Sequence, residues 1–493
     1  MNSLLKAMDK RVKASPDNVA FTSIMNNEYI SLTYQEFWQH AHDTAQQLSA
    51  LSCRCIALRE HNGIAWAVMD IAAQLAQVVL VPVPHFFSDS QVSHLLAQSG
   101  ADCVIGDWQH GIELEYASTP LNDIYGLAVQ RIDNQRGAIL PETCKITFTS
   151  GSTGHPKGVC LSADNVYRVS QALADTVGPS IKEGTHLAVL PLATLLENIT
   201  SIYVPLLLGE TCVLLPQEWV GLSGSSQFNP TAFANALTAH SPSSVVLTPA
   251  LLEVLVVLVE QTPELGRSFQ FIAVGGARVS SALMNKAHQL GLPAFQGYGL
   301  SECASVVSVN TPSHFKLSSA GQVLNHQHVK VDRQGQLWVS GNIALGYIGA
   351  PFTDKWLATG DLAEFDDAGY LTITGRSNNQ LVTAYGRNIS PEWVESEAQA
   401  YPSLRHLIVV GDGDTRLTAV VVHCSPAAVL DDLYALNQHL PDYAQLKLCL
   451  CRAVYPKEHR LWTDNGKPLR GEFAQWAHEQ RHTLLSIRDE RKK

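Results

Sequence analysis

The feature that most constrains the fold is a series of short, continuously apolar runs separated by helix-like segments. A strand with one face in water alternates apolar and polar residues, so an unbroken apolar run indicates a strand buried on both faces. Such strands form parallel sheets, whose crossover connections are helices. The runs are residues 55–58, 78–83, 101–105, 187–190, 212–215, 244–247 and 271–274. The sequence therefore predicts an α/β fold with parallel-type sheets, and residues 281–290 have the apolar spacing of one connecting helix.

The sequence pattern changes twice toward the C-terminus. Residues 337–374 consist of short strand-like pieces separated by turn residues, which indicates a small β-rich part. Beyond it, Ser390-Pro391-Glu392 has the composition of a helix start and residues 418–423 read as a strand, which is an α+β pattern. We expect a large N-terminal domain, residues 1–375, followed by a small mobile α+β domain, residues 376–493.

Charge and hydropathy exclude several classes of protein. The net charge is −11 and the longest basic run is the end of the chain, residues 488–493, so nucleic acid is not expected as a partner. The most apolar stretch, residues 64–83, contains Asp70, Gln74, Gln77 and Pro82. It fits a buried helix running into a strand, and no membrane span is expected. Residues 1–17 carry too many charges for a secretory signal and predict a surface helix.

The ten cysteines are scattered along the chain without a C-x-x-C motif. This spacing predicts neither a zinc site nor a disulfide framework. A reduced, cytoplasmic setting is the simplest interpretation.

Residues 147–158 contain the densest group of polar, anion-binding residue types. The segment Thr147-Phe-Thr-Ser-Gly-Ser-Thr-Gly-His-Pro-Lys-Gly158 has five hydroxyls, three glycines and one lysine behind the apolar Ile146. Glycines let the backbone approach an anion, and hydroxyls, amide N–H groups and Lys157 hold phosphate oxygens. The pattern differs from the G-x-x-x-x-G-K-[ST] loop because Gly158 follows the lysine. Composition alone also fits a flexible surface loop.

Thr149-Ser-Gly-Ser-Thr-Gly-His-Pro-Lys157 resembles the phosphate loop of the adenylate-forming (AMP-binding) superfamily, which includes acyl-CoA synthetases. Further segments resemble the family's other motifs in the same order. They are Gly297-Tyr-Gly-Leu-Ser-Glu302, Thr359-Gly-Asp361, Gly375-Arg376, the segment of residues 385–395, and Asn465-Gly-Lys467. The resemblance covers almost the whole chain and is closest to fatty or long-chain acyl-CoA synthetases.

The resemblance implies a role for each matched residue. The nucleotide is expected to bind at Thr149, Ser150, Gly151, Ser152, Thr153, Gly154, Lys157, Gly275, Gly276, Ala277, Tyr298, Gly299, Asp361 and Arg376. Glu302 is expected to hold Mg²⁺, a hard ion that prefers carboxylate and phosphate oxygens. Ser301 can donate to the α-phosphate, Tyr298 offers a flat face to adenine, and Asp361 can accept both ribose hydroxyls. Taken singly, each of these residues also has an ordinary structural reading, as a core aromatic, a turn residue or a surface charge.

Lys467 is the expected catalytic lysine, together with Glu302 and Ser301. When a carboxylate attacks the α-phosphate, two anions approach each other, and a lysine that bridges them offsets their repulsion. A lysine in Asn-Gly-Lys is by itself an ordinary turn residue, so this role rests on the resemblance.

Two residues depart from the family pattern. Thr194 stands where long-chain acyl-CoA synthetases usually have a histidine between the ATP and acyl sites, which puts the gating of the acyl pocket in doubt. Asn378 replaces the aspartate or lysine that is usual at the hinge.

The resemblance implies that the chain activates a carboxylic acid, most simply a medium or long fatty acid, to acyl-AMP with release of pyrophosphate. Transfer to the thiol of CoA would then give acyl-CoA. The expected ligands are ATP, Mg²⁺ and CoA. Alternatives remain open: a fatty acyl-AMP ligase that loads the phosphopantetheine of an acyl carrier protein, a luciferase-like oxidative enzyme, and a non-catalytic nucleotide-binding scaffold.

Overall fold

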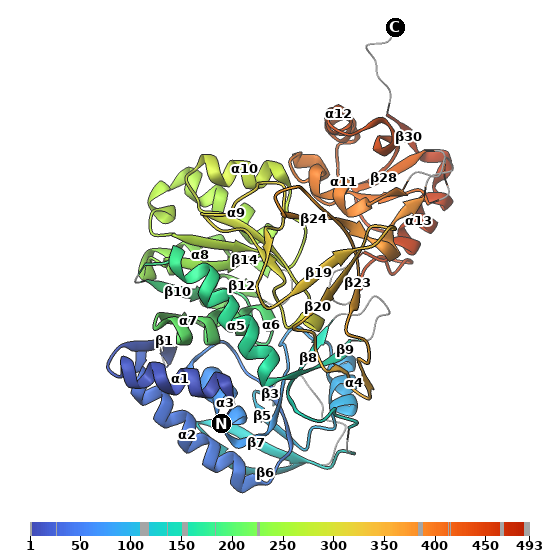
Figure 1. Cartoon of the computed structure of the whole chain (residues 1–493). Coiled ribbons are helices and arrows are strands. Elements are labelled where there is room, and N and C mark those ends of the chain that lie inside the picture. The colour runs from blue at the N-terminus through green and yellow to red at the C-terminus, as the bar shows by residue number, and fades with distance from the viewer. Residues whose placement is uncertain are drawn as a thin grey trace.

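The computed structural model describes the chain apart from residues 1, 26, 109–117, 136, 150–155, 183, 224–226, 383–387, 413, 415, 464–467 and 488–493. Two nine-stranded sheets form its larger part, with helices between them and on their outer faces (Figure 1). The α/β class expected from the apolar runs is confirmed.

The first large sheet has the order β18-β17-β16-β15-β14-β10-β11-β1-β2. Its central strands, from β16 to β1, pair in parallel, and antiparallel strands complete both edges. The strands are β1 (Val19–Met25), β2 (Glu28–Thr33), β10 (Thr185–Ala188), β11 (Thr211–Leu214), β14 (Ser244–Leu247), β15 (Phe271–Val274), β16 (Ala294–Tyr298), β17 (Ser308–Val309) and β18 (Gln322–Val323).

The second large sheet has the order β22-β21-β9-β8-β4-β3-β5-β7-β6. Strands β8, β4, β3 and β5 are parallel, and β9 folds back beside β8 as a hairpin. The strands are β3 (Cys55–Arg59), β4 (Val79–Pro82), β5 (Cys103–Gly106), β6 (Ser118–Ile124), β7 (Leu127–Ile132), β8 (Thr143–Thr149), β9 (Lys157–Ser162), β21 (Gly346–Tyr347) and β22 (Ala350–Pro351).

Both faces of the parallel strands are buried, as the unbroken apolar runs predicted. In β3, Ile56 and Leu58 belong to the core between the two sheets, while Cys55 and Ala57 pack into the core on the opposite face. The inner core includes α1 (Ser3–Ala14), α2 (Tyr34–Leu51), α3 (Ile64–Ala76) and α5 (Ala163–Val177). The outer faces are covered by α8 (Pro230–His240), α9 (Pro249–Gln261) and α10 (Ser281–Gln289) on the first sheet and by α4 (Asp89–Ser99) on the second.

Two smaller sheets follow along the chain. The β-rich part is an antiparallel sheet of β19 (His328–Val331), β20 (Gln336–Ser340), β23 (Leu357–Phe365) and β24 (Leu371–Arg376). The small C-terminal domain contains β27 (Ile408–Val410), β28 (Leu417–Val422), β29 (Leu446–Arg452) and β30 (Leu485–Ser486), with α11 (Pro391–Ala398), α12 (Pro426–Asn437) and α13 (Arg470–Glu479). Short pairs complete the strands: β12 (Leu222–Ser223) with β13 (Gln227–Phe228), and β25 (Leu381–Val382) with β26 (Asn388–Ile389). Ser390 caps α11, as its Ser-Pro-Glu start predicted.

A buried ion pair joins the second sheet to the helices of the inner core. Lys145 on β8 lies 2.8 Å from Asp70 on α3, and both side chains are almost fully buried. The hydroxyl of Tyr203 donates to Asp70 at 2.6 Å and accepts from Lys145 at 2.7 Å. The amide of Asn198 also donates to Asp70. Every charge is therefore matched by an opposite charge or a hydrogen bond, which is the condition for tolerating ions in a core.

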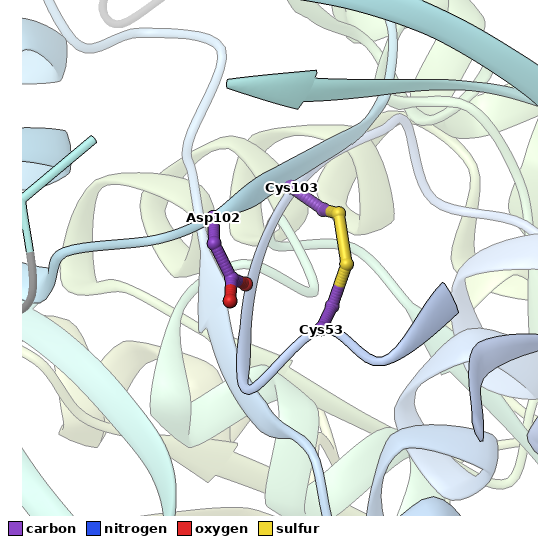
Figure 2. Close-up of side chains that lie close together, drawn as sticks. All are labelled: Cys53, Asp102 and Cys103. Carbon is purple, nitrogen blue, oxygen red and sulfur yellow. A yellow bond between two sulfur atoms is a disulfide. The ribbon is translucent and has the colours of Figure 1, made fainter. Parts of the chain in front are cut away.

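The expectation that the cysteines stay unpaired is wrong at one place. Cys53 and Cys103 form a disulfide with their Cα atoms 6.4 Å apart (Figure 2). Cys53 lies just before β3 and Cys103 begins β5, and these two strands are parallel neighbours, so both residues reach the same end of the sheet. The sequence separation of 50 residues hides this proximity, because it depends on the sheet order. Asp102 beside the disulfide accepts hydrogen bonds from the backbone of Arg54 and Cys55.

Among the helices that the structure describes, none has the length and apolar composition needed to cross a membrane. Residues 64–83 form α3 and β4, the helix and strand predicted for the most apolar stretch.

Replacing Lys145 with methionine should destabilise the fold by about 3–5 kcal/mol, because Asp70 would remain buried without its cation. Replacing both residues, Lys145→Met with Asp70→Leu, should recover much of that loss. Urea unfolding followed by circular dichroism measures both effects. As a control, Lys13→Met removes a pair with Asp9 in which the lysine side chain is 74% exposed, and it should cost less than about 1 kcal/mol. Equal losses for the two single variants would contradict the structural role given to the buried pair.

Candidate functional site

The main cavity lies where the carboxyl ends of both large sheets face each other. Its volume is about 650 Å³. Thr147 and Thr149 reach it from β8 of the second sheet, and Tyr298 reaches it from the end of β16 in the first. In open α/β sheets, ligands bind beyond the carboxyl ends of the strands, because loops there carry polar groups that the buried strands cannot. Of the expected site residues, the cavity is lined by Thr149, Gly275, Gly276, Tyr298, Gly299 and Ser301.

A tight turn after β16 places Ser301 and Glu302 beside this cavity. The short helix Ser301–Cys303 is followed by Ala304 and Ser305, whose φ angles of 55° and 99° are unusual for residues with a side chain. Gly299 is required here, because a Cβ at this position would lie 1.6 Å from the carbonyl oxygen of Ser305. Packing therefore requires a glycine at position 299, in addition to the nucleotide-binding role that the sequence predicts for it.

The carboxylate of Glu302 is held by an aromatic residue from the opposite side. The hydroxyl of Tyr347 on β21 donates to Oε1 of Glu302 at 2.8 Å, and Nζ of Lys157 lies 5.1 Å from the centre of the Tyr347 ring. Burial and the Glu302 carboxylate raise the pKa of Tyr347, so its hydroxyl remains a donor. A carboxylate offers about four lone-pair sites, so Glu302 has capacity for a hard cation beside this bond.

Tyr298, Asp361 and Arg376 form a connected chain. The Tyr298 hydroxyl donates to Oδ2 of Asp361 at 2.6 Å, and Nε of Arg376 lies 2.8 Å from Oδ1 of the same carboxylate. Asp361 is 3% exposed, whereas the Arg376 side chain is 58% exposed. Burial, reinforced by Asp361, raises the pKa of Tyr298 well above its usual range, which keeps the phenol protonated. These three expected residues are therefore brought together, and Arg376 stands on β24 directly opposite Asp361 on β23.

Gly275, Gly276 and Ala277 follow β15 at the same edge of the sheet. Gly276 has a φ of 80°, and a Cβ there would meet nothing within 4 Å, so the backbone faces open space. Gly275 and Gly276 line the cavity, while Ala277 is exposed beside it.

Two parts of the expected site lie outside the described residues. They are Ser150, Gly151, Ser152, Thr153 and Gly154 of the polar loop, and Lys467. The residues that flank these segments are described. Thr149 pairs with Lys157 across the hairpin of β8 and β9, and Trp462 pairs with Pro468.

The rest of the cavity wall is mainly apolar. It extends from Thr194, whose hydroxyl donates to the carbonyl of Pro191 at 2.7 Å, toward α5 and α7 (Val204–Leu208). The residues between α6 (Leu195–Asn198) and α7 form a π-helical turn, Ile199–Tyr203, a distortion that is frequent at functional sites. The apolar wall includes Leu173, Val177, Ile181, Val204, Pro205, Leu208, Val245 and Phe271.

A buried polar chain adjoins this apolar wall, and two of its members, His186 and Ser244, also line the cavity. Oε1 of Glu197 accepts from the Val189 backbone and from Ser201, and the Ser201 hydroxyl lies 2.9 Å from Nε2 of His186. Nδ1 of His186 lies 2.9 Å from Ser244. Burial raises the pKa of Glu197 to about 8 and lowers the pKa of His186 to about 4. Both groups are therefore neutral near neutral pH, which is how the core accepts them.

Sequence reasoning missed Tyr347 and Glu197. Tyr347 lies in Gly346-Tyr-Ile-Gly349, whose glycines indicated only turns. Glu197 lies three residues after Thr194, the residue that departs from the family pattern. A carboxylate within an apolar run is the signal that would have identified it, because such a group needs a specific buried partner.

A protein-family model described as AMP-binding enzyme matches residues 8–348. The 2-succinylbenzoate–CoA ligase of Bacillus subtilis is 25% identical over 437 residues, with 83% of this chain and 85% of the relative covered. A long-chain-fatty-acid–CoA ligase of Mycobacterium bovis is 23% identical over 476 residues, covering 82% and 79%.

A solved structure shares the fold. It is the o-succinylbenzoate CoA synthetase of Bacillus subtilis in complex with its acyl-adenylate intermediate, with a TM-score of 0.75 at 22% identity. The alignment covers 95% of this chain and 97% of that one.

The raised pKa of Glu197 predicts how stability depends on pH. Below its unfolded pKa of 4.5 the carboxyl is protonated in both states, and from there to about pH 8 only the folded state holds the proton. The wild-type chain should therefore lose stability, relative to Glu197→Gln, as pH rises through this window, by roughly a few kcal/mol in all. Urea unfolding at pH 5 and pH 8.5 measures the difference.

The matched control is Glu364→Gln, which changes an exposed carboxylate and should follow the wild-type dependence. If the unfolding free energies of Glu197→Gln and wild type changed in parallel over this pH range, Glu197 would be ionised in the folded protein. The assignment of a neutral carboxyl to Glu197 would then be wrong.

Proposed function

The chain belongs to the AMP-binding enzyme family, and on this premise we propose that it is an AMP-forming acid–thiol ligase. It converts a carboxylic acid and ATP to acyl-AMP and pyrophosphate, and then transfers the acyl group to CoA. One observation carries the proposal: a single cavity of about 650 Å³ is lined at one end by Thr149, Gly276, Tyr298 and Ser301 and elsewhere mainly by apolar residues. A nucleotide and an apolar acid can therefore meet inside one enclosure.

The described residues have distinct parts in the first step. Asp361, oriented by Tyr298 and Arg376, accepts the ribose hydroxyls, and Ser301 donates to the α-phosphate. Glu302, oriented by Tyr347, would hold the Mg²⁺ that accompanies ATP. When bound, that ion neutralises phosphate charge. The loop between Thr149 and Lys157 holds the outgoing phosphates with hydroxyls and backbone N–H groups.

Lys467 acts on the small domain, which we propose to span residues 376–493 and to rotate between the two steps. In the first step its ammonium bridges the attacking carboxylate and the α-phosphate, where negative charge accumulates. In the second step the thiol needs access to the acyl carbonyl, so the lysine withdraws. Arg405 of the small domain pairs with Glu253 on α9 at 2.8 Å, an exposed contact that costs little to break during such a rotation.

We propose a medium or long fatty acid as the substrate. The support is the apolar wall formed by Leu173, Val177, Ile181, Val204, Pro205 and Leu208, which can pack against an alkyl chain. Three polar residues, His186, Glu210 and Ser244, also line the cavity. Thr194, which is smaller than a histidine, also lines this cavity.

The acceptor is proposed to be CoA, in a cytoplasmic enzyme with access to ATP. The phosphopantetheine of an acyl carrier protein is the alternative acceptor, and thioester formation with each thiol distinguishes them. A non-catalytic nucleotide-binding scaffold would bind ATP without acid-dependent release of pyrophosphate.

The variant Lys467→Ala should lose most adenylation while keeping thioester formation from supplied acyl-AMP. Loss of one contact to the developing charge raises the barrier by roughly 3–4 kcal/mol. Pyrophosphate release measures the first step and CoA-dependent consumption of acyl-AMP measures the second. Lys457→Ala, an exposed lysine of the same domain, is the control and should leave both rates unchanged. Equal losses in both steps would overturn the proposed rotation.

Across a panel of acids, octanoate to palmitate should release pyrophosphate faster than acetate, benzoate or amino acids. Each buried methylene contributes about 0.8 kcal/mol, so kcat/KM should rise with chain length until the cavity is filled. A flat profile from acetate upward, or a maximum with aryl acids, would refute the fatty-acid assignment and leave the adenylation chemistry intact.

A further inference from the structure

Three metal-ligating residue types meet at the carboxyl edge of the second sheet, outside the site described above. His61 follows β3, His85 follows β4 and Asp107 follows β5. These strands are parallel neighbours in the order β4-β3-β5, so their carboxyl ends lie together although the three residues are far apart in sequence. One ligand atom from each of the three lies within 4.8 Å of the others.

The two imidazoles are oriented by hydrogen bonds away from the cluster. Oε1 of Gln217 lies 3.1 Å from Nδ1 of His61, and the His85 ring hydrogen-bonds to the backbone of Glu60. Nε2 of His85 is buried and has no hydrogen-bond partner among the described residues. When one ring nitrogen donates to an oxygen, the other keeps its lone pair, which is the arrangement of metal-binding histidines.

The surroundings provide charge for a cation. Glu60 and Asp107 contribute two carboxylates, and Arg59 contributes one positive charge, with Nη1 lying 3.9 Å from Oδ2 of Asp107. With neutral imidazoles these groups sum to one excess negative charge. The imidazole rings of His61 and His85 are stacked, with centroids 4.0 Å apart.

A second cavity, of about 210 Å³, opens at this cluster. Glu60, His61, His85 and Gln217 line it, and it shares Phe86 and Ala193 with the wall of the main cavity. An ion held by three protein ligands would therefore have a coordination position facing space that a water molecule or another small ligand can enter.

We propose that His61, His85 and Asp107 bind one divalent transition-metal ion of the Zn²⁺ class. Two imidazole nitrogens and one carboxylate oxygen suit Zn²⁺ or Co²⁺ better than Mg²⁺ or Ca²⁺, which prefer oxygen ligands. This ion is separate from the Mg²⁺ expected at Glu302. It links the loops after three adjacent strands, and its binding does not depend on the acid that the enzyme activates.

The group of Cys53, Asp102 and Cys103 is the other cluster of ligand types among the described residues (Figure 2). Its two sulfurs are bonded to each other, and the Asp102 carboxylate is occupied by backbone N–H groups of Arg54 and Cys55. This group is therefore a weaker candidate for a metal site than His61, His85 and Asp107.

Titration of the full-length, metal-free chain with Co²⁺ tests the proposal. A visible ligand-field absorption should saturate at one ion per chain, without the sulfur-to-metal band that cysteine ligation would produce, and Zn²⁺ should abolish it. His61→Ala, His85→Ala and Asp107→Asn should each weaken binding by at least about 100-fold, because a direct ligand matters more than the outer groups that orient it. Zn²⁺ should also raise the Tm of the wild type and not of these variants.

His328→Ala is the matched control, since His328 is exposed on β19 and lies outside the cluster, and it should bind Co²⁺ as the wild type does. Circular dichroism in chelator establishes that each variant folds, so that lost binding reports a lost ligand. Absence of a saturable signal, a sulfur-to-metal band, or undiminished binding in the His61 and His85 variants would each overturn the proposal. Activity with fatty acids is not part of the readout, so failure here leaves the proposed ligase function untouched.

Discussion

Burial of the parallel strands on both faces is the constraint on which the rest of this structure depends. A strand enclosed between two helical layers carries mostly apolar side chains, so most polar groups collect in the loops at the strand ends. The carboxyl ends of the two sheets face each other, and the main cavity and the smaller cavity beside His61 both lie along that line. The buried Lys145–Asp70 pair behind these edges is tolerated because each charge has a partner.

Much of the fold followed from sequence periodicity. The runs at residues 55–58 and 244–247 became β3 and β14, and residues 281–290 became α10, because a doubly buried strand and an amphipathic helix have distinct apolar patterns. The disulfide between Cys53 and Cys103 did not follow, since pairing depends on the order of strands in a sheet. Strand order is decided by tertiary packing and leaves no local signal.

The candidate site was foreseeable to a similar extent. Tyr298 and Asp361 were expected in one site from ordered motifs, and the structure places their side chains in direct contact. Tyr347 was missed because its partner Glu302 lies 45 residues away, on another element. Glu197 was missed although an acid within an apolar run is a signal, because the sequence does not show that its carboxyl is neutral. Residues whose role depends on a distant partner are the ones that local patterns cannot reveal.

Two side chains, Tyr298 and Arg376, bind the Asp361 carboxylate, and this arrangement has a thermodynamic consequence. One oxygen of this carboxylate accepts a hydrogen bond from Tyr298, which lines the main cavity, and the other pairs with Arg376, the last residue of β24. A molecule that takes the lone pair of Asp361 facing Arg376 competes with the arginine for it, and a displaced arginine changes the carboxylate that the molecule meets. Binding of such a molecule and release of Arg376 would then be linked, and by thermodynamic reciprocity each would change the free energy of the other by the same amount.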